Sequence, residues 1–293
     1  MRELPHLKHV HLDGPYITDE GLNTIIDLPN IQGLALDDTN VTGEGLGLLK
    51  NAKKLEYLSL YGATVNDSTL KQIDKIENLN HLQIIRTSVS NEGMIFLTQL
   101  SKLRGLDLYQ NNGITDISGI GQLINLEALD IAGNSAINKG FSQLKVLHKL
   151  KGLRIWTAPF DDNDMKIMDD LKELTSLALK STQITDAGLV HIETLMNLKS
   201  LDLSGNIKIT DQGLECLKPL TNLEYLTLYW TNVTGAGMAH LKSLTKLKSL
   251  AVGPNITKSD LSELIKTLPD CHFSIIDSSG VIIEDLTPAN DHN

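Results

Sequence analysis

Residues with metal-binding side chains alternate near the start of the chain, in the order His9, His11 and Asp13. Imidazole and carboxylate groups are zinc ligands, and such a trio would suit a metal-dependent hydrolase. If the three residues lie on one strand, successive side chains on the same face are about 6.6 Å apart, which is wide for ligating one ion. No neighbouring residue is an obvious fourth ligand. A hydrolase is therefore the least favoured interpretation, and we expect no metal or cofactor.

A second acidic group, Asp161, Asp162 and Asp164, contains oxygen ligands of the kind that calcium prefers. The group lacks the glycine and the terminal glutamate of a calcium-binding loop, and acids that open a helix explain it better. The sequence also contains no glycine-rich phosphate loop and no Ser-His-Asp arrangement in a supporting context. We therefore expect that the protein is not an enzyme.

Aromatic residues make up only 4% of the chain, so their positions are informative. Both tryptophans and five of the six tyrosines recur at related positions of a repeated pattern: Tyr57, Tyr61, Tyr109, Trp156, Tyr225, Tyr229 and Trp230. Tyrosine and tryptophan present large, rigid contact areas and dominate the energetics of protein interfaces. We therefore predict that these residues form a protein-binding surface. The alternatives are a half-exposed sheet that tolerates tyrosine and a surface on which a glycan stacks.

Charged residues fall at the same positions of the pattern. They are Asp13, Asp37, Asp38, Asp107, Asp130, Asp202, Arg86, Arg154 and Lys180. We assign five of them to the predicted binding site with the aromatic residues: Arg86, Arg154, Asp107, Asp130 and Asp202. Exposed charges mainly tune the rate and the specificity of association. A solvated acidic sheet without a partner is the alternative.

These side chains are positioned by a tract of the form Leu-x-x-Leu-x-Leu that returns about every 24 residues. Its first residues are Leu7, Ile31, Leu55, Leu79, Leu103, Leu126, Leu150, Leu174, Leu198, Leu223 and Leu247. So regular a period predicts a solenoid of about eleven stacked repeats. Strand alternation turns the third, fifth, seventh and eighth residues of each repeat outward, and the aromatic and charged residues lie at these positions.

The first half of a repeat is illustrated by residues 174–182 (LTSLALKST). Alternation of Leu177 and Leu179 with small or polar residues indicates a short strand with its leucines turned inward. Thr182 occupies the ninth position, which Thr or Asn fills in most other repeats. Such side chains can hydrogen-bond to the backbone where the chain turns, so we expect a ladder of them along the array.

The second half of the same repeat, residues 183–197, returns to the core through Ile184. Thr185 is expected to cap a short helix, and Asp186 suits the positive end of that helix. Leu189, Ile192 and Leu195 follow at helical spacing. Each repeat therefore predicts a strand, a tight turn, a short helix and a return.

The tract Ile-Thr-Asp-x-Gly-Leu stands at residues 17–22, 184–189 and 209–214, and in relaxed form at residues 41–46 and 233–238. On these motifs the chain resembles a leucine-rich-repeat protein over residues 7 to about 276, with repeats similar to those of F-box substrate receptors. The cysteines of those receptor repeats are mostly absent. Residues 113–127 are similar to the repeats of bacterial internalins, which favours a bacterial origin.

The resemblance implies an α/β fold, namely a right-handed solenoid shaped as a horseshoe or arc. Its parallel β-sheet would line the concave face, and its short helices would cover the convex side. We expect a repeat array over residues 1–270, a partial repeat or cap over residues 271–286 around the turn Ser278-Ser279-Gly280, and a flexible tail over residues 287–293. Irregular repeats predict local changes of curvature within residues 110–165.

Composition limits the partners. A net charge of −10 and a pI near 5.3 argue against a nucleic-acid-binding surface. No stretch is apolar enough for membrane insertion, and residues 1–6 lack a signal-peptide core. The compartment is therefore open: cytoplasmic, or secreted as part of a longer protein. Two cysteines are too few for a disulfide framework, and Cys216 reads as a buried free thiol.

These observations predict a non-catalytic, monomeric module that binds a protein on its concave face. The alternative is a structural spacer, or the recognition part of a larger bacterial surface or effector protein.

Overall fold

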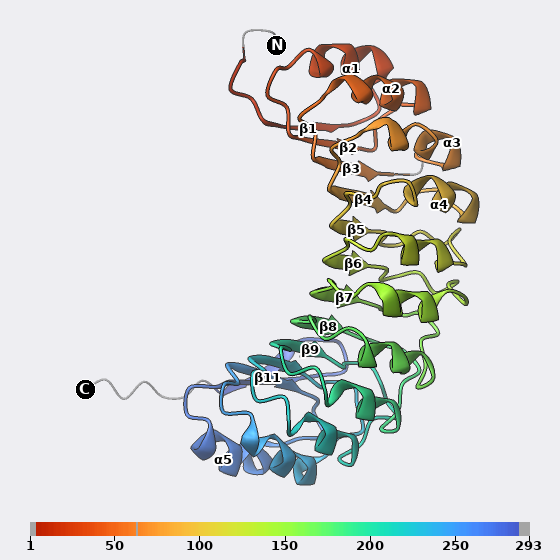
Figure 1. The fold of residues 1–293 in the computed structure, drawn as a ribbon. Coiled ribbons are helices and arrows are strands. Elements are labelled where there is room, and N and C mark those ends of the chain that lie inside the picture. The colour runs from red at the N-terminus through yellow and green to blue at the C-terminus, as the bar shows by residue number, and fades with distance from the viewer. Residues whose placement is uncertain (1–3, 63, 287–293) are drawn as a thin grey trace. The chain divides into compact units, whose positions relative to one another are not determined.

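The computed structural model describes residues 4–62 and 64–286. The chain divides into two compact units, residues 1–150 and residues 151–293, called here the first and the second unit. In each unit the strands lie side by side along one side, and the helical turns lie along the other (Figure 1). This is the α/β arrangement that the repeat predicts. The predicted flexible tail, residues 287–293, lies outside the described residues.

The first unit contains six parallel strands that follow one another in chain order. They are β1 (His9–Asp13), β2 (Gly33–Asp37), β3 (Tyr57–Tyr61), β4 (His81–Ile85), β5 (Gly105–Asp107) and β6 (Ala128–Asp130). The register advances by one whole repeat per strand, so that Tyr57 pairs with Gly33 on one side and His81 on the other. Residues at the same repeat position therefore stand in rows across the sheet.

Short helical segments connect these strands. Four are α-helices: α1 (Asp19–Ile26), α2 (Gly43–Leu48), α3 (Asp67–Leu70) and α4 (Asn91–Leu97). The others are 3-10 helices: η1 (Leu49–Asn51), η2 (Ile73–Lys75), η3 (Ser118–Gln122) and η4 (Phe141–Val146).

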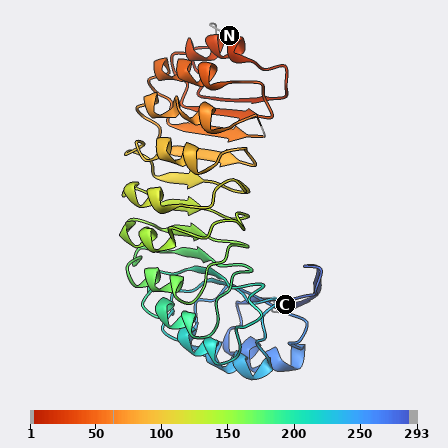
Figure 2. The ribbon, with the colours of Figure 1, turned by 90° about the vertical axis from the view of Figure 1, so that its right-hand side faces the viewer.

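The second unit contains β7 (Gly152–Arg154), β8 (Ser176–Ala178), β9 (Ser200–Asp202), β10 (Tyr225–Thr227), β11 (Ser249–Val252), β12 (His272–Ile276) and β13 (Ile282–Leu286). Strands β7 to β12 are parallel, and β13 pairs antiparallel with β12. Its helical segments are the 3-10 helices η5 (Asp164–Asp169), η6 (Gly188–Ile192), η7 (Gly213–Leu217) and η8 (Gly235–Ser243), and the α-helix α5 (Lys258–Thr267). Within this unit the helices follow the outside of a bend and the strands its inside (Figure 2).

The C-terminal pair β12 and β13 forms a hairpin around the Ser278-Ser279-Gly280 turn. The Asp277 carboxylate accepts hydrogen bonds from the backbone nitrogens of Ser279 at 2.8 Å and Val281 at 2.9 Å, and Gly280 adopts a φ of +84°. These hydrogen bonds lower the pKa of Asp277.

The core consists of the leucine rows that the period predicts. In the eighth repeat Leu177, Leu179, Ile184, Leu189 and Ile192 are at most 1% exposed. Each such side chain contributes about 1.5–3 kcal/mol by leaving water.

The predicted ladder at the ninth repeat position is confirmed. The Asn206 side chain is 1% exposed, and its Nδ2 donates to the carbonyl oxygens of Leu179 at 2.7 Å and Leu203 at 2.8 Å. Its Oδ1 accepts from the backbone nitrogen and the Oγ1 of Thr182, each at 2.9 Å. Because buried backbone groups need partners, this side chain ties the turns of two adjacent repeats together.

The aspartate of the Ile-Thr-Asp-x-Gly-Leu tract has a different partner from the one predicted. The Asp186 carboxylate accepts hydrogen bonds from the backbone nitrogen of Thr210 at 2.8 Å and from its Oγ1 at 2.6 Å. The same contact joins Asp162 to Thr185 and Asp211 to Thr234. The aspartate therefore forms hydrogen bonds with the threonine of the following repeat, whereas the sequence predicted that it mainly stabilises the N-terminal end of a helix.

The glycine of the tract makes room for that aspartate. A Cβ on Gly213 would lie 2.3 Å from Asp186 Oδ1, and one on Gly237 would lie 2.3 Å from Asp211 Oδ1. The prediction of a helix capped by Thr185 also needs correction, because η6 is a 3-10 helix that begins at Gly188. Thr185 Oγ1 instead accepts a hydrogen bond from the Ala187 nitrogen at 3.2 Å.

Candidate functional site

The candidate site lies on the surface formed by the third, fifth, seventh and eighth residues of the repeats, called here the strand face. All twelve residues of the predicted site lie on the strands of this face or directly after them. Tyr225 is 49% exposed, whereas the other six aromatic residues are half-buried. The rings are thus accessible without being fully solvated.

In the second unit, three aromatic residues surround one lysine. The Lys180 Nζ lies 5.6 Å from the ring centre of Trp156, 5.4 Å from that of Tyr229 and 5.3 Å from that of Trp230. It also donates a hydrogen bond to the Tyr229 hydroxyl at 3.1 Å. The distances fall within the range of cation–π attraction, so the ammonium group is held by rings from two other repeats, the seventh and the tenth.

Small residues in the ninth repeat allow this assembly. Lys180 belongs to the eighth repeat and Tyr229 to the tenth, so the lysine side chain must pass the ninth. There the seventh and eighth positions are Ser204, which is fully buried, and Gly205, with a φ of +76°. A larger side chain at the seventh position would lie in the row between Lys180 and Tyr229, whereas a Cβ on Gly205 would meet Ser181 Oγ at 2.2 Å.

Trp230 occupies a backbone position that favours glycine. Its φ is +57°. The equivalent eighth position is glycine in four other repeats, and in five it is Asp38, Arg86, Gln110, Thr157 or Ser181 with a φ between +48° and +56°. A bulky residue in the left-handed region is uncommon and costs about 1–2 kcal/mol. The Trp230 ring packs edge-on against Tyr229 with 4.8 Å between centroids, and its Nε1 donates to the Asp277 carbonyl at 3.1 Å.

Arg154 extends the same cluster, because its guanidinium carbon lies 4.5 Å from the Trp156 ring centre. Among the described residues, two buried side-chain polar atoms have no hydrogen-bond partner in the protein, and both lie here: Trp156 Nε1 and Ser204 Oγ. An indole N–H can only donate, so Trp156 lacks an acceptor.

In the first unit the tyrosines are tied into polar networks. The Tyr57 hydroxyl donates to Gln83 Oε1 at 2.5 Å, and Gln83 Nε2 donates to Asp107 at 3.2 Å. Arg86 donates to the Tyr61 hydroxyl at 3.0 Å and also to the Gln110 side chain. The hydrogen bond to Tyr61 is the main cause that raises the pKa of Arg86.

The three aspartates at the fifth position have a structural partner that the sequence analysis missed. Asp107, Asp130 and Asp202 each accept a hydrogen bond at 2.9 Å from the backbone nitrogen two residues later. All three stand four residues before a buried asparagine of the ninth-position ladder, at residues 111, 134 and 206. The pairing of Asp with Asn inside one repeat was the signal that could have revealed this role.

The histidine trio of β1 does not assemble a metal site. His11 Nε2 lies 2.7 Å from Asp37 Oδ2 on the neighbouring strand. Over residues 4–62 and 64–286, no three His, Cys, Asp or Glu side chains come together as metal ligation requires.

The second acidic group, Asp161, Asp162 and Asp164, forms a local turn. The Asp161 carboxylate accepts hydrogen bonds from the backbone nitrogens of Asn163 at 2.9 Å and Asp164 at 3.1 Å.

A polar hollow of about 410 Å³ lies in the first unit beside the starts of the strands. Its lysines are engaged, since Lys102 donates to Asn78 at 2.8 Å and Lys149 donates to Asn125 at 2.6 Å. Arg104 pairs with Glu127 at 3.1 Å. The hollow therefore belongs to the contacts between successive repeats.

Both cysteines are buried free thiols, as predicted for Cys216. Burial is the main cause that raises the pKa of Cys216 to about 11 and that of Cys271 to about 12. Neither thiol has the lowered pKa of a reactive cysteine.

In the described part of the chain no helix has the length and hydropathy needed to cross a membrane.

Comparisons with known proteins agree with this geometry. Residues 101–146 match the family model "Leucine Rich repeats (2 copies)", and residues 172–192 and 194–218 match the model "Leucine Rich repeat". No curated protein matches the chain.

Solved structures with the same fold come from several sources. An internalin (InlF) from Listeria monocytogenes has 26% identity and a TM-score of 0.63, over 77% of this chain and 68% of the internalin chain. A leucine-rich-repeat protein of Leptospira interrogans has 19% identity and a TM-score of 0.52, over 93% of this chain and 91% of the other. TLR13, solved in complex with ssRNA13, has 23% identity and a TM-score of 0.58, over 86% of this chain and 40% of that one.

Proposed function

Because this chain is a leucine-rich-repeat protein, we propose that it is a non-catalytic module that captures a protein partner on its strand face. Leucine-rich-repeat folds typically serve as protein interaction modules. The observation that carries the proposal is the cluster of Trp156, Tyr229 and Trp230 around Lys180. Tyr225 begins β10, the strand that directly precedes Tyr229 and Trp230. Exposed aromatic rings beside cations are characteristic of binding hot spots.

The backbone of Trp230 supports a binding role over a role in folding. Other repeats adopt this left-handed conformation with glycine in four cases and with Asp, Arg, Gln, Thr or Ser in five, so the fold does not require a tryptophan here. Keeping a tryptophan in a left-handed conformation is unfavourable locally, and such strain is found more often at functional sites. The internalin and Leptospira likenesses support the repeat fold and are consistent with a bacterial origin.

Site-specific photo-crosslinking tests the proposal. A photoreactive amino acid replaces Tyr225, which is 49% exposed on the strand face, and in a matched protein it replaces Val190, which is 48% exposed within η6. Incubated with extracts of the source organism, the Tyr225 protein should form a discrete crosslinked protein species that the Val190 protein does not form.

In the protein with the photoreactive amino acid at position 225, the added changes Tyr229→Ser and Trp230→Gly should weaken capture of that species at least tenfold. The same species from both positions, or only from Val190, would move the site off the strand face. No crosslink from either position would favour the structural spacer.

A further inference from the structure

We propose, building on the proposed function, that the second unit binds an acidic segment of its partner and that Lys180 is the central cation that receives the carboxylate groups. The proposal rests on the arrangement of donors around Lys180, on the charge of the surrounding surface and on the way the lysine is held.

The side chains at the centre of the cluster are hydrogen-bond donors. Lys180 carries an ammonium group, Arg154 a guanidinium group, and Trp156 an indole N–H without an acceptor among the described residues. None of these three groups can accept a hydrogen bond. A carboxylate oxygen supplies the negative charge for Lys180 and the acceptor for Trp156 Nε1, and charge-assisted hydrogen bonds to an ammonium group are strong. Because Trp156 Nε1 is covered, a ligand reaches it only after a neighbouring side chain shifts.

The carboxylates nearest the cluster are already engaged. At the outward positions of β7 to β12 and the turns after them, the charged residues are Arg154, Lys180, Asp202 and Asp277, and the Asp277 carboxylate accepts hydrogen bonds within its own turn. Asp202 already accepts a hydrogen bond from the Ser204 backbone. In the same unit, Lys199 and Lys248 lie beside the strand starts and pair with Glu224 at 3.8 and 2.6 Å. Among the described residues no carboxylate pairs with Lys180, so an acidic segment of a partner would supply its counter-charge.

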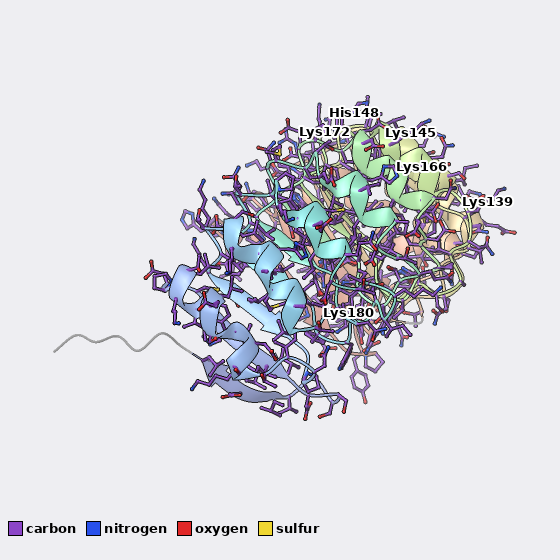
Figure 3. The ribbon with its side chains drawn as sticks, turned by 90° about the horizontal axis from the view of Figure 1, so that it is seen from below. Lys139, Lys145, His148, Lys166, Lys172 and Lys180 are labelled. Atoms are coloured by element: carbon purple, nitrogen blue, oxygen red, sulfur yellow. The ribbon has the colours of Figure 1, made fainter. Side chains whose placement is uncertain are left out.

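Lys180 is also held in position before any ligand arrives. Three rings and the Tyr229 hydroxyl constrain a side chain that otherwise has many rotamers. Immobilising a flexible lysine side chain on binding costs conformational entropy, and a lysine that is already constrained loses less of it. Figure 3 shows the contrast within the second unit: Lys180 projects on the strand side, whereas Lys166 and Lys172 lie on the helical side.

An acidic protein segment fits this surface better than RNA. Nucleic-acid binding relies on several phosphate contacts from Lys and Arg, and this face has two cations together with two carboxylates, Asp202 and Asp277. RNA binding is nevertheless a distinct outcome that the experiment detects, since aromatic rings beside cations can also stack on bases.

The test uses the full chain and three labelled probes of equal length: oligoglutamate, oligoglutamine and oligouridylate. Fluorescence anisotropy should show binding of oligoglutamate at least tenfold tighter than that of oligoglutamine or oligouridylate, weakening as salt is added. Lys180→Gln and Trp230→Gly should each weaken oligoglutamate binding tenfold or more. Lys166→Gln removes the same charge from the helical side and should leave it unchanged, while Lys180→Arg should retain most of it.

Equal effects of Lys166→Gln and Lys180→Gln would overturn the assignment, as would absence of a preference for oligoglutamate. Tighter binding of oligouridylate that depends on Lys180 would replace the acidic protein segment by single-stranded RNA. If the Tyr225 crosslink captures a protein whose binding survives Lys180→Gln, the proposed function stands and only this inference fails.

Discussion

On the strand face of the first unit, the hydroxyls of Tyr57 and Tyr61 are tied to Gln83 and Arg86 of the next repeat. On the strand face of the second unit, the rings of Trp156, Tyr229 and Trp230 surround a lysine. On the first face, the tyrosine hydroxyls already form hydrogen bonds with the neighbouring repeat. On the second face several donors lie close together, because the small Ser204 stands between Lys180 and Tyr229 in the row of seventh positions and lets the lysine reach across a whole repeat. The same backbone positions therefore support two different surfaces.

The loops after the strands differ between the units as well. In the second unit the aspartate-to-threonine contact runs over three consecutive steps, from Asp162, Asp186 and Asp211 to the following repeats. In the first unit it joins Asp19 to Thr42 and Asp67 to Ser90, and Asn91 takes the place of the aspartate in the next step. A continuous ladder makes each repeat of the second unit depend more strictly on its neighbour.

The largest predicted effect comes from the glycine of the tract. Gly213→Ala should lower the free energy of unfolding by about 2–4 kcal/mol, because its Cβ would overlap the Asp186 carboxylate and lie 2.9 Å from Leu189 Cδ1. Gly21 fills the same motif position in the first repeat, but its Cβ would meet only Ile17 Cγ2 at 4.0 Å. Gly21→Ala in α1 should be neutral or stabilise by up to about 1 kcal/mol. Urea denaturation measures both, and equal losses would contradict the contact between repeats.

A smaller effect should appear at high pH, and it concerns the second unit because both cysteines lie there. Their folded pKa values, about 11 and about 12, exceed the unfolded value near 9, so folding favours the neutral thiols. This stability is complete below about pH 9 and is lost as pH rises toward the folded values. At pH 10 we expect a loss of about 1 kcal/mol per cysteine relative to pH 8.

The control for this prediction is the double variant Cys216→Ala, Cys271→Ala, compared with the native chain at both pH values. Other groups titrate equally in the two proteins, so the difference in their pH dependence isolates the thiols. Identical pH dependence would mean that the buried thiols ionise as readily as exposed ones.

The smallest predicted effect on stability is that of Trp230→Gly. The variant loses a half-buried ring and the hydrogen bond to Asp277, but it gains the residue that favours a φ of +57°. These contributions are each about 1–2 kcal/mol and oppose one another, so the net change should be within about 1 kcal/mol. Thermal melting is the measurement, and Thr157→Gly at the equivalent position (φ +56°) is the matched control that removes no ring. A loss above about 3 kcal/mol would mean that the tryptophan is retained for folding.

Much of the architecture followed from the sequence, because burial in a repeat depends on local alternation. The leucine rows, the ninth-position ladder and the parallel order of strands could all be read from a period of about 24 residues. The placement of Tyr57, Trp156 and Trp230 on the strand face followed from the same alternation. Their role in binding stays a prediction until the crosslinking and anisotropy measurements are made.

The sequence by itself determined which residues face inward and which face outward, since that depends only on the spacing of side chains along one strand. Only the tertiary structure decided which outward residues meet. Asp186 contacts a threonine 24 residues away, and Lys180 contacts a tyrosine 49 residues away. Such contacts depend on the register between repeats and on the small size of the side chains that lie between the partners. Neither the register between repeats nor the side chains that lie between two distant partners can be read from the pattern of a single repeat.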